Sequence, residues 1–186
     1  MSDKQPQSPR ERSQQQQRPG RHAGVGMLVI SFALGIGLLT LFFDDMLEQQ
    51  FNPNQRPDTR LMQSGGMELV LQRNRQGHYV MGGDISGEPV TFLLDTGATD
   101  VVIPAQLAES AGLQPGQAMR AMTANGLVTV YSTTIPTLHL GDITLYDVRA
   151  SINPGMQGDT VLLGMSALRQ VEFTQRADTL TLRTLP

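Results

Sequence analysis

Apolar and polar residues alternate in short runs from Met67 onward, and most runs end at Gly, Asn or Asp. A period of two with such breaks is typical of short β-strands. The pattern predicts strands over residues 67–72, 78–81, 89–94, 101–104, 127–134, 143–152 and 161–163. Only residues 105–111 and 165–170 have a helical pattern, each of about two turns. We therefore expect a mostly β domain over residues 67–186, with one or two short helices.

A continuous apolar run occupies residues 23–43, where no residue is charged. As a helix, these 21 residues are long enough to cross a hydrocarbon layer of about 30 Å, which predicts a transmembrane helix. Basic residues exceed acidic ones before the run, and Asp44, Asp45 and Glu48 follow it, so the positive-inside rule places the N-terminus in the cytoplasm. A cleaved signal peptide is the competing interpretation; the long polar leader and the lack of a small-x-small site argue against it.

The segments on either side of this run are polar. Residues 1–22 are rich in Gln, Pro, Ser and Arg and lack the apolar residues of a core, which predicts a disordered cytoplasmic tail. Residues 44–66 contain Pro53 and Pro57 and end in Ser64-Gly65-Gly66, which indicates a linker. The folded domain is therefore expected to begin at Met67.

The composition excludes several kinds of site. The chain has no cysteine, so disulfides, thiolate metal sites and cysteine nucleophiles are excluded. His22, His78 and His139 are dispersed, with no acidic residue at ligand spacing, so neither a metal nor another cofactor is expected. The formal net charge of −3 gives no broad basic surface, and nucleic acid is not expected as a partner.

The strongest chemical signal is Asp95, which follows the apolar run 90–94 and precedes Thr96-Gly97-Ala98. A lone carboxylate at the end of a buried strand is costly unless its charge is hydrogen-bonded. Gly97 lets a turn approach closely, and backbone N–H groups of such a turn can bind the carboxylate. A carboxylate that only caps its own turn is the structural alternative. The context favours a functional acid that is held in place.

The sequence Asp95-Thr96-Gly97-Ala98 after an apolar strand resembles the active-site motif of the retropepsins, the retroviral-type aspartic peptidases. Two further segments fit this family in the same order. Thr123-Ala124-Asn125-Gly126 contains Asn-Gly between β-prone runs, a strong hairpin signal, and resembles the flap. Leu162-Leu163-Gly164 resembles the segment that packs beneath the family's active-site loop. With the membrane helix, the arrangement is similar to a group of bacterial retropepsin-like proteins.

The resemblance implies the acid-protease fold as a single lobe, a closed β-barrel, and a catalytic role for Asp95. Aspartic peptidases place two carboxylates around one water, and the motif occurs once here, so the resemblance implies a homodimer. Thr96 would link the two active-site loops, Gly97 would let substrate approach, and Ala98 would complete the loop. Residues 180–186 alternate like a strand and are candidates for pairing between subunits, as termini do in the viral enzymes.

The expected function is a membrane-anchored aspartic endopeptidase that cleaves polypeptides on the outer side of a bacterial inner membrane. The alternative is a catalytically silent retropepsin-like domain that binds peptides or acts as a scaffold. A third interpretation is a membrane-tethered interaction domain with another fold, which a strictly monomeric state would favour. Residues 164–168 resemble the nucleophile elbow of serine hydrolases, but Leu168 stands at the last Gly position and no histidine partner is indicated.

Overall fold

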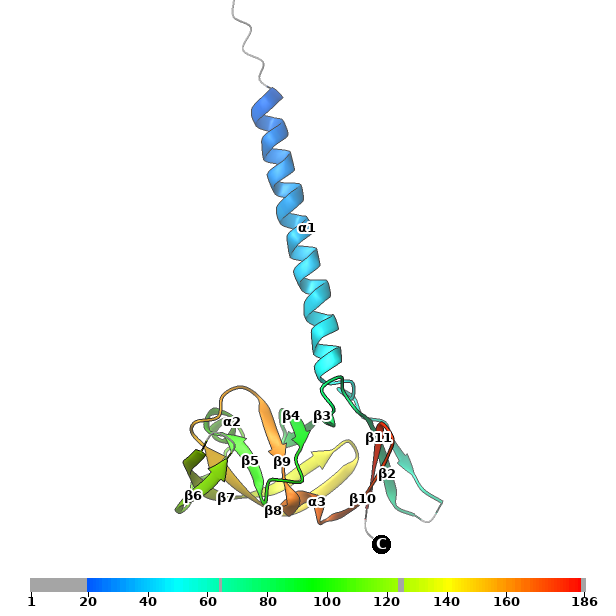
Figure 1. The fold of residues 1–186 in the computed structure, drawn as a ribbon, viewed down its shortest axis with the longest axis vertical. Helices are drawn as coiled ribbons and strands as arrows, with labels where there is room; N and C mark the ends of the chain where they lie inside the picture. Colours follow the sequence, from blue (N-terminus) through cyan, green and yellow to red (C-terminus); the bar gives the residue numbers. More distant parts are fainter. Residues whose placement is uncertain (1–19, 64, 124–125, 185–186) are drawn as a thin grey trace, which may run out of the picture. The chain divides into compact units, whose positions relative to one another are not determined.

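The computed structural model describes residues 20–63, 65–123 and 126–184, and Figure 1 shows its helices and strands. The chain divides into two units, residues 1–43 and residues 44–186. The first unit contains most of a long helix, and the second contains every strand of the described residues.

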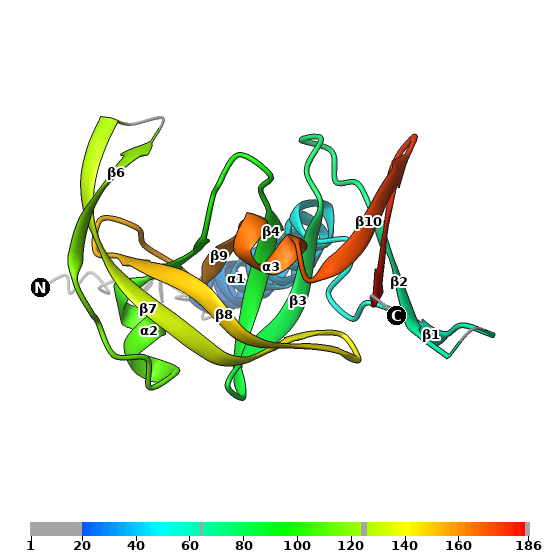
Figure 2. The same ribbon diagram turned by 90° about the horizontal axis from the view of Figure 1, so that it is seen from below.

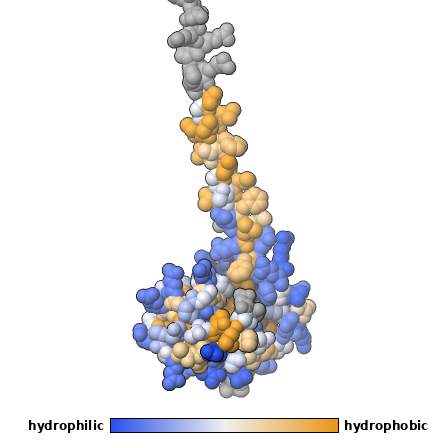
Figure 3. Space-filling model, turned by 60° about the vertical axis from the view of Figure 1, so that its left-hand side comes forward, coloured by the Kyte–Doolittle hydropathy of each residue, from blue (hydrophilic) through white to orange (hydrophobic). Residues whose placement is uncertain are grey.

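Helix α1 (Gly20–Phe51) is apolar over the segment that was predicted to cross a membrane. The large hydrophobic side chains between Val25 and Phe43 are exposed, and Figure 3 shows the mainly apolar surface that they form. The helix has 32 residues, which corresponds to about 48 Å and exceeds a hydrocarbon thickness of about 30 Å. By length and composition, Gly24–Phe51 is a candidate membrane span. The expected helix is therefore present, and it continues beyond Phe43.

The second unit is mostly β, as the alternating pattern predicts. Two short helices, α2 (Ala105–Ser110) and α3 (Met165–Leu168), lie where helical patterns were expected. The strands are β1 (Thr59–Leu61), β2 (Met67–Gln72), β3 (Val80–Ile85), β4 (Glu88–Leu94), β5 (Val101–Pro104), β6 (Ala118–Thr123), β7 (Gly126–Leu140), β8 (Ile143–Asn153), β9 (Thr160–Leu163), β10 (Val171–Arg176) and β11 (Thr179–Thr184). Strands β1, β6 and β10 were not predicted, because their largely exposed residues show little apolar alternation.

These strands form two sheets. The smaller sheet has the order β1-β2-β11-β10 and is antiparallel throughout. The larger sheet has the order β3-β4-β9-β5-β8-β7-β6, and β3 also pairs with β7 at Asp84↔His139 and Ile85↔Leu138. That additional pairing closes the sheet on itself, so the mostly β, barrel-like fold that was predicted is confirmed (Figure 2).

Strand β9 occupies a place that its sequence position does not suggest. It pairs in parallel with β4, through Leu94↔Leu163, and it contacts β5 through Val102↔Leu162. A late strand therefore lies between two early ones, and the chain between β4 and β5 must pass over the end of β9. The loop that contains Asp95 is that crossing.

The core fixes these strands through their buried faces. Phe92 of β4 is fully buried, as are Val161 and Leu163 of β9. Leu69 and Leu182 of the smaller sheet belong to the same hydrophobic cluster. Full burial of one such side chain contributes about 1.5–3 kcal/mol, so the two sheets share one core that holds β4 and β9 in register.

The segment predicted as a linker, residues 44–66, contains ordered structure. Helix α1 continues to Phe51, and β1 pairs with β2. Asn54 is buried; its Nδ2 donates to the carbonyl oxygens of Gln72 at 2.9 Å and Val80 at 2.7 Å, and its Oδ1 accepts from Gln72 N at 2.7 Å. The structured part therefore begins before Met67. The polar composition of residues 44–66 suggested a linker, because the side chain that fixes this segment to the strands is the amide of Asn54 and not an apolar group.

The C-terminal strand β11 was expected to pair with a second subunit, but it pairs within its own chain. Strand β11 pairs with β2 on one side and β10 on the other, all within one chain. Both of its edges are occupied, so residues 179–184 cannot extend a sheet into a partner. Leu185 and Pro186 lie outside the described residues.

We predict that Asn54→Ala lowers the free energy of unfolding of residues 44–186 by about 2–4 kcal/mol, because buried backbone groups of β2 and β3 lose their partner. Denaturant unfolding followed by circular dichroism measures the change. Gln55→Ala, at the exposed next position, is the matched control and should change stability by less than about 0.5 kcal/mol. Equal stability of residues 44–186 and 67–186 would contradict this role of the N-terminal segment.

Candidate active site

Asp95 lies in a tight turn immediately after β4. Its Oδ1 accepts a hydrogen bond from Gly97 N at 2.8 Å, and its carbonyl oxygen accepts one from Ala98 N at 3.2 Å. The side chain is partly exposed, and it forms no ion pair among the described residues. The turn therefore holds one carboxylate oxygen through a backbone N–H group and leaves further acceptor capacity free.

The strands on both sides of β4 fix the entrance to this turn. Leu94 N donates to the carbonyl oxygen of Tyr79 at 3.0 Å, which ties the end of β4 to the residue before β3. Asp95 N donates to the carbonyl oxygen of Leu163 at 3.2 Å, which ties the turn to the end of β9. The carboxylate is thus attached to a frame that is hydrogen-bonded on both sides.

Gly164 lies directly beneath the loop that carries Asp95. A Cβ atom at this position would overlap the carbonyl group of Asp100 and would lie 2.8 Å from the carbonyl oxygen of Ala98. The next two residues bind the same loop, since Met165 N donates to Ala98 O at 2.8 Å and Ser166 N to Thr99 O at 2.9 Å. The predicted active-site residues 95–98 and the predicted supporting residues 162–164 are therefore brought together.

Ser166 is a supporting residue that the sequence did not reveal. Its Oγ donates to the carbonyl oxygen of Arg149 at 2.6 Å and accepts from Val101 N at 3.0 Å. Arg149 in turn donates from Nε to Asp100 Oδ1 at 2.8 Å. The Gly-x-Ser pattern was weighed only as a serine nucleophile, whereas in the structure the hydroxyl group bridges the backbones of β5 and β8.

Strands β6 and β7 form the predicted hairpin. Thr123 pairs with Gly126, and Thr123 Oγ1 donates to Gly126 O at 2.9 Å. Gly126 has a φ of 103°, a conformation that favours glycine. Ala124 and Asn125, the other two residues of the predicted flap, lie outside the described residues. Figure 2 shows this hairpin reaching the same side of the domain as the loop after β4.

The hairpin exposes apolar side chains near its end. Met122 is 79% exposed and its cross-strand neighbour Leu127 is 56% exposed. Figure 3 shows apolar side chains gathered on the side of the domain that carries β6 and β7. Neighbouring exposed apolar side chains of this size are typical of surfaces that bind a peptide or another protein.

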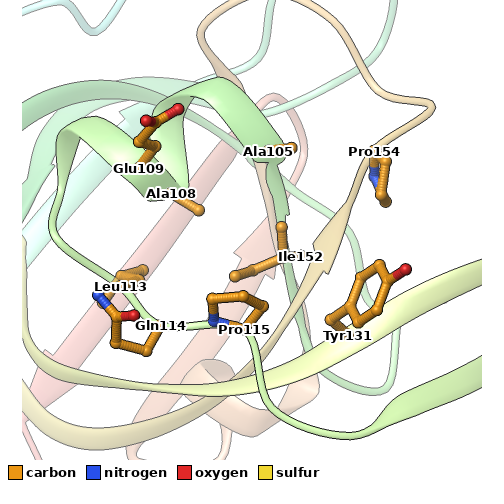
Figure 4. Close-up of a pocket in the computed structure, with 9 residues that line it drawn as sticks. All are labelled: Ala105, Ala108, Glu109, Leu113, Gln114, Pro115, Tyr131, Ile152 and Pro154. Carbon is orange, nitrogen blue, oxygen red and sulfur yellow. The ribbon is translucent and has the colours of Figure 1, made fainter.

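A separate pocket of about 470 Å³ lies between α2, the segment that follows it, and strands β7 and β8. Figure 4 shows Tyr131 and Ile152 directed toward it, with Pro115 and Pro154 at its sides. None of its lining residues belongs to the loop that carries Asp95. Among the described residues, no group of three or more His, Asp or Glu side chains is arranged to hold a metal ion.

Comparison with known sequences identifies related proteins. Residues 81–170 match the family model for a gag-polyprotein putative aspartyl protease. The chain is also 33% identical over 123 residues to a Sinorhizobium sp. protein described as an uncharacterized protein in the cobV 5' region. That match covers 64% of this chain and 53% of the relative, so the chain spans about half the length of this curated relative.

Comparison with solved structures supports the same relationship at the level of the fold. A retropepsin-like aspartic protease from Rickettsia conorii aligns with a TM-score of 0.54 and 23% identity, over 69% of this chain and 94% of that chain. EIAV protease complexed with the inhibitor HBY-793 aligns with a TM-score of 0.43 and 20% identity, over 53% of this chain and 92% of that chain. The likeness to the Rickettsia protein confirms the predicted retropepsin-like fold.

We predict that Gly164→Ala destabilises the domain by about 1–3 kcal/mol, because the added methyl group displaces the backbone of Ala98 and Asp100. Denaturant unfolding measures the loss, and amide exchange at residues 95–100 reports whether the loop loosens. Gly155→Ala is the control, since its Cβ would meet only Asn153 Oδ1 at 3.4 Å. Unchanged stability and exchange in Gly164→Ala would show that the loop does not depend on this contact.

Proposed function

We propose that the chain is an aspartic endopeptidase of the retropepsin type that acts as a homodimer; the match of residues 81–170 to an aspartyl protease family model and the retropepsin-like fold support this proposal. Each subunit would supply one Asp95. Two carboxylates that face one another at about 3 Å cannot both ionise, so they share one proton and bind a water between them. One chain alone supplies only half of this site.

The observation that carries the proposal is the geometry of Asp95. The carboxylate is oriented by Gly97 N–H at 2.8 Å, remains partly exposed, and sits on a loop supported by Gly164. A carboxylate that only caps its own turn needs no more than this one hydrogen bond, whereas the proposed role also needs an accessible second oxygen. Asp95 keeps acceptor capacity for a water or a second carboxyl group.

The proposed reaction needs only these two carboxyl groups and water. The ionised carboxylate takes a proton from the water as the water oxygen attacks the carbonyl carbon of the peptide bond. The protonated partner donates its proton to the carbonyl oxygen. When the tetrahedral intermediate collapses, the C–N bond breaks and the nitrogen takes up a proton, which leaves a carboxylic acid and an amine.

The proposed substrate is an extended polypeptide. The hairpin of β6 and β7 would close over it, and backbone groups of the hairpin would bind it as an added strand. Met122 and Leu127 are exposed near the end of this hairpin and would cover apolar side chains of the substrate. Thr96 would join the two active-site loops, in keeping with its exposed position beside Asp95.

We also propose that α1 anchors the chain in a bacterial inner membrane. Five basic residues, Lys4, Arg10, Arg12, Arg18 and Arg21, precede the apolar run, and Asp44, Asp45 and Glu48 follow it. This charge asymmetry favours a cytoplasmic N-terminus and a peptidase domain on the opposite, periplasmic side. Two chains anchored in one membrane have a raised effective concentration, which would favour the dimer.

We predict that Asp95→Asn lowers kcat/KM of the full chain toward an unfolded protein by at least about 10²–10⁴-fold, because the pair loses its general base and acid. The assay is cleavage of unfolded casein by the detergent-solubilised chain. Asp159→Asn removes another exposed acid and is the matched control. Retention of more than about a tenth of the activity in Asp95→Asn would contradict the proposal.

A mixing experiment tests whether the site is shared between subunits. With subunit exchange, a tenfold excess of the Asp95→Asn chain should reduce the activity of a fixed amount of wild-type chain to about one tenth, by mass action. The reason is that nearly every wild-type subunit then has a partner without the carboxylate. Activity that is independent of the added variant would indicate that one chain is sufficient.

We predict that the full chain stays with the membrane fraction after an alkaline carbonate wash, and that deletion of residues 20–43 releases it. Protease added to intact spheroplasts should digest the domain and leave a tag at the N-terminus protected. Loss of the N-terminal tag through cleavage near residue 44 would instead support the signal-peptide interpretation.

A further inference from the structure

The hairpin of β6 and β7 leaves the barrel at a position that the strand pairings define. Strand β7 pairs with β8 from Tyr131 to Leu140, while its residues 126–130 pair with β6 alone among the described strands. Strand β6 begins opposite the same residue, at the pair Ala118↔Tyr131. Tyr131 therefore marks the base of the hairpin, and no other described strand pairs with the hairpin between this base and its tip.

The connection that leads into β6 is fixed just below this base. Gly116 N donates to Ser132 O at 2.7 Å, and Ser132 N donates to Gln117 O at 3.0 Å. Thr133 Oγ1 donates to the carbonyl oxygen of Gln114 at 2.9 Å. Both strands of the hairpin are thus attached to the barrel up to the base, so a movement of the hairpin must turn about the base.

The cavity of about 470 Å³ lies at this base. Two of its walls belong to the base itself, namely Tyr131 from β7 and Pro115 from the connection. The other walls belong to the barrel and include Ala105 and Ala108 of α2 and Ile152 of β8, the residue that pairs with Tyr131. Figure 4 shows these side chains around one hollow. A molecule in the cavity would therefore contact the base of the hairpin and the barrel at the same time.

The lining of the cavity favours an apolar ligand that carries a positive charge. Ala108, Leu113 and Ile152 are buried and supply apolar surface. Glu109 is exposed, is the only charged side chain among the 9 lining residues, and forms no ion pair within the described part of the chain. The ring of Tyr131 can pack against an apolar body or a cation. The volume lies within the range of small-molecule sites, about 300–1,000 Å³.

We infer that this cavity binds a small primary amine with an apolar body, and that the bound amine restrains the hairpin. The apolar body fills the space between Tyr131 and Ile152, and the ammonium group pairs with Glu109. Because the ligand contacts the base of the hairpin and the barrel together, it stabilises their present arrangement. The binding itself needs neither a second chain nor a peptide substrate, whereas its effect on cleavage rests on the proposed function.

Binding is tested with 2-phenylethylamine and the full chain in detergent. A ligand of this size is expected to bind with a Kd on the order of 1 mM. A titration followed by NMR should shift the amide signals of Ala108, Leu113 and Ile152 along one saturation curve. 3-Phenylpropionate has a similar apolar body and a negative charge, and it should bind at least about threefold more weakly, because attraction to Glu109 becomes repulsion.

Substitutions test where the amine binds. Ala105→Leu enlarges a side chain in the wall of the cavity and should raise the Kd at least about tenfold. Gln106→Leu adds the same side chain to α2 outside the cavity and is the matched control. Glu109→Gln should raise the Kd about two- to fivefold, the range of an exposed ion pair, whereas Glu172→Gln on β10 should leave it unchanged. Equal Kd values for the wild type and both cavity variants overturn the site.

The motion of the hairpin tests the restraint. At an amine concentration ten times the Kd, any hairpin state that cannot hold the ligand is populated about tenfold less. The NMR relaxation dispersion of amides 119–123 and 126–130 reports motion on the μs–ms timescale and should fall accordingly. The same amine concentration should leave the dispersion of the Ala105→Leu chain nearly unchanged. Dispersion in the wild type that does not respond to bound amine overturns the restraint.

Cleavage kinetics connect the site with the proposed function. Saturating amine should lower kcat for casein and leave KM within about twofold, because it slows opening of the hairpin without occupying the peptide site. Cleavage by the Ala105→Leu chain should not respond to the amine. A rise in KM alone would show that the amine competes with the peptide, which overturns the inferred mode of action.

The outcomes separate this site from the peptidase activity. A chain that cleaves casein and binds no amine in the cavity overturns the site and leaves the proposed function standing. A chain that binds the amine with reduced hairpin motion and cleaves nothing supports the site and overturns the proposed function. A chain that neither binds the amine nor cleaves casein overturns both.

Discussion

The arrangement of this domain depends on the contact between Gly164 and the loop after Asp95. Strand β9 lies between β4 and β5, so the chain that joins these two early strands must cross the end of β9. The crossing backbone passes so close that a Cβ atom at position 164 would overlap Asp100. The hydrogen bonds of Met165 and Ser166 to residues 98 and 99 depend on that close approach. The absence of a side chain at position 164 therefore allows the loop that carries the carboxylate to rest on the end of β9.

Polar side chains complete the parts of the fold that apolar packing does not reach. Asn54 binds backbone groups of Gln72 and Val80, and Ser166 binds those of Val101 and Arg149. In both cases a side chain takes the place of a strand neighbour and satisfies backbone groups that would otherwise lack a partner. Such residues are polar in the sequence and structural in the fold, which is why neither was predicted to support the domain.

Several groups of a single chain lack a hydrogen-bond partner or remain exposed to water among the described residues. Asp95 keeps acceptor capacity, the Tyr79 hydroxyl has no partner among the described residues, and β10 is an open edge. Met122 and Leu127 add exposed apolar surface on the hairpin. The second Asp95 and the bound peptide that we propose would cover Asp95 and the hairpin. An anchor in a shared membrane would restrict the search for the second chain to two dimensions and raise its effective concentration.

The sequence alone determined the elements whose signals are local. The alternation of apolar residues predicted most strands, the uncharged run predicted the helix at 23–43, and the residues 95–98 and 162–164 were singled out as one site. What the sequence could not show depends on contacts between distant segments: the placement of β9 between β4 and β5, the use of Asn54 and Ser166 as backbone ligands, and the confinement of β11 between β2 and β10. Local patterns report which face of a strand is buried, because burial follows the period of the side chains. They do not report which strand lies beside it, because that choice is made by packing and hydrogen bonding in the folded chain.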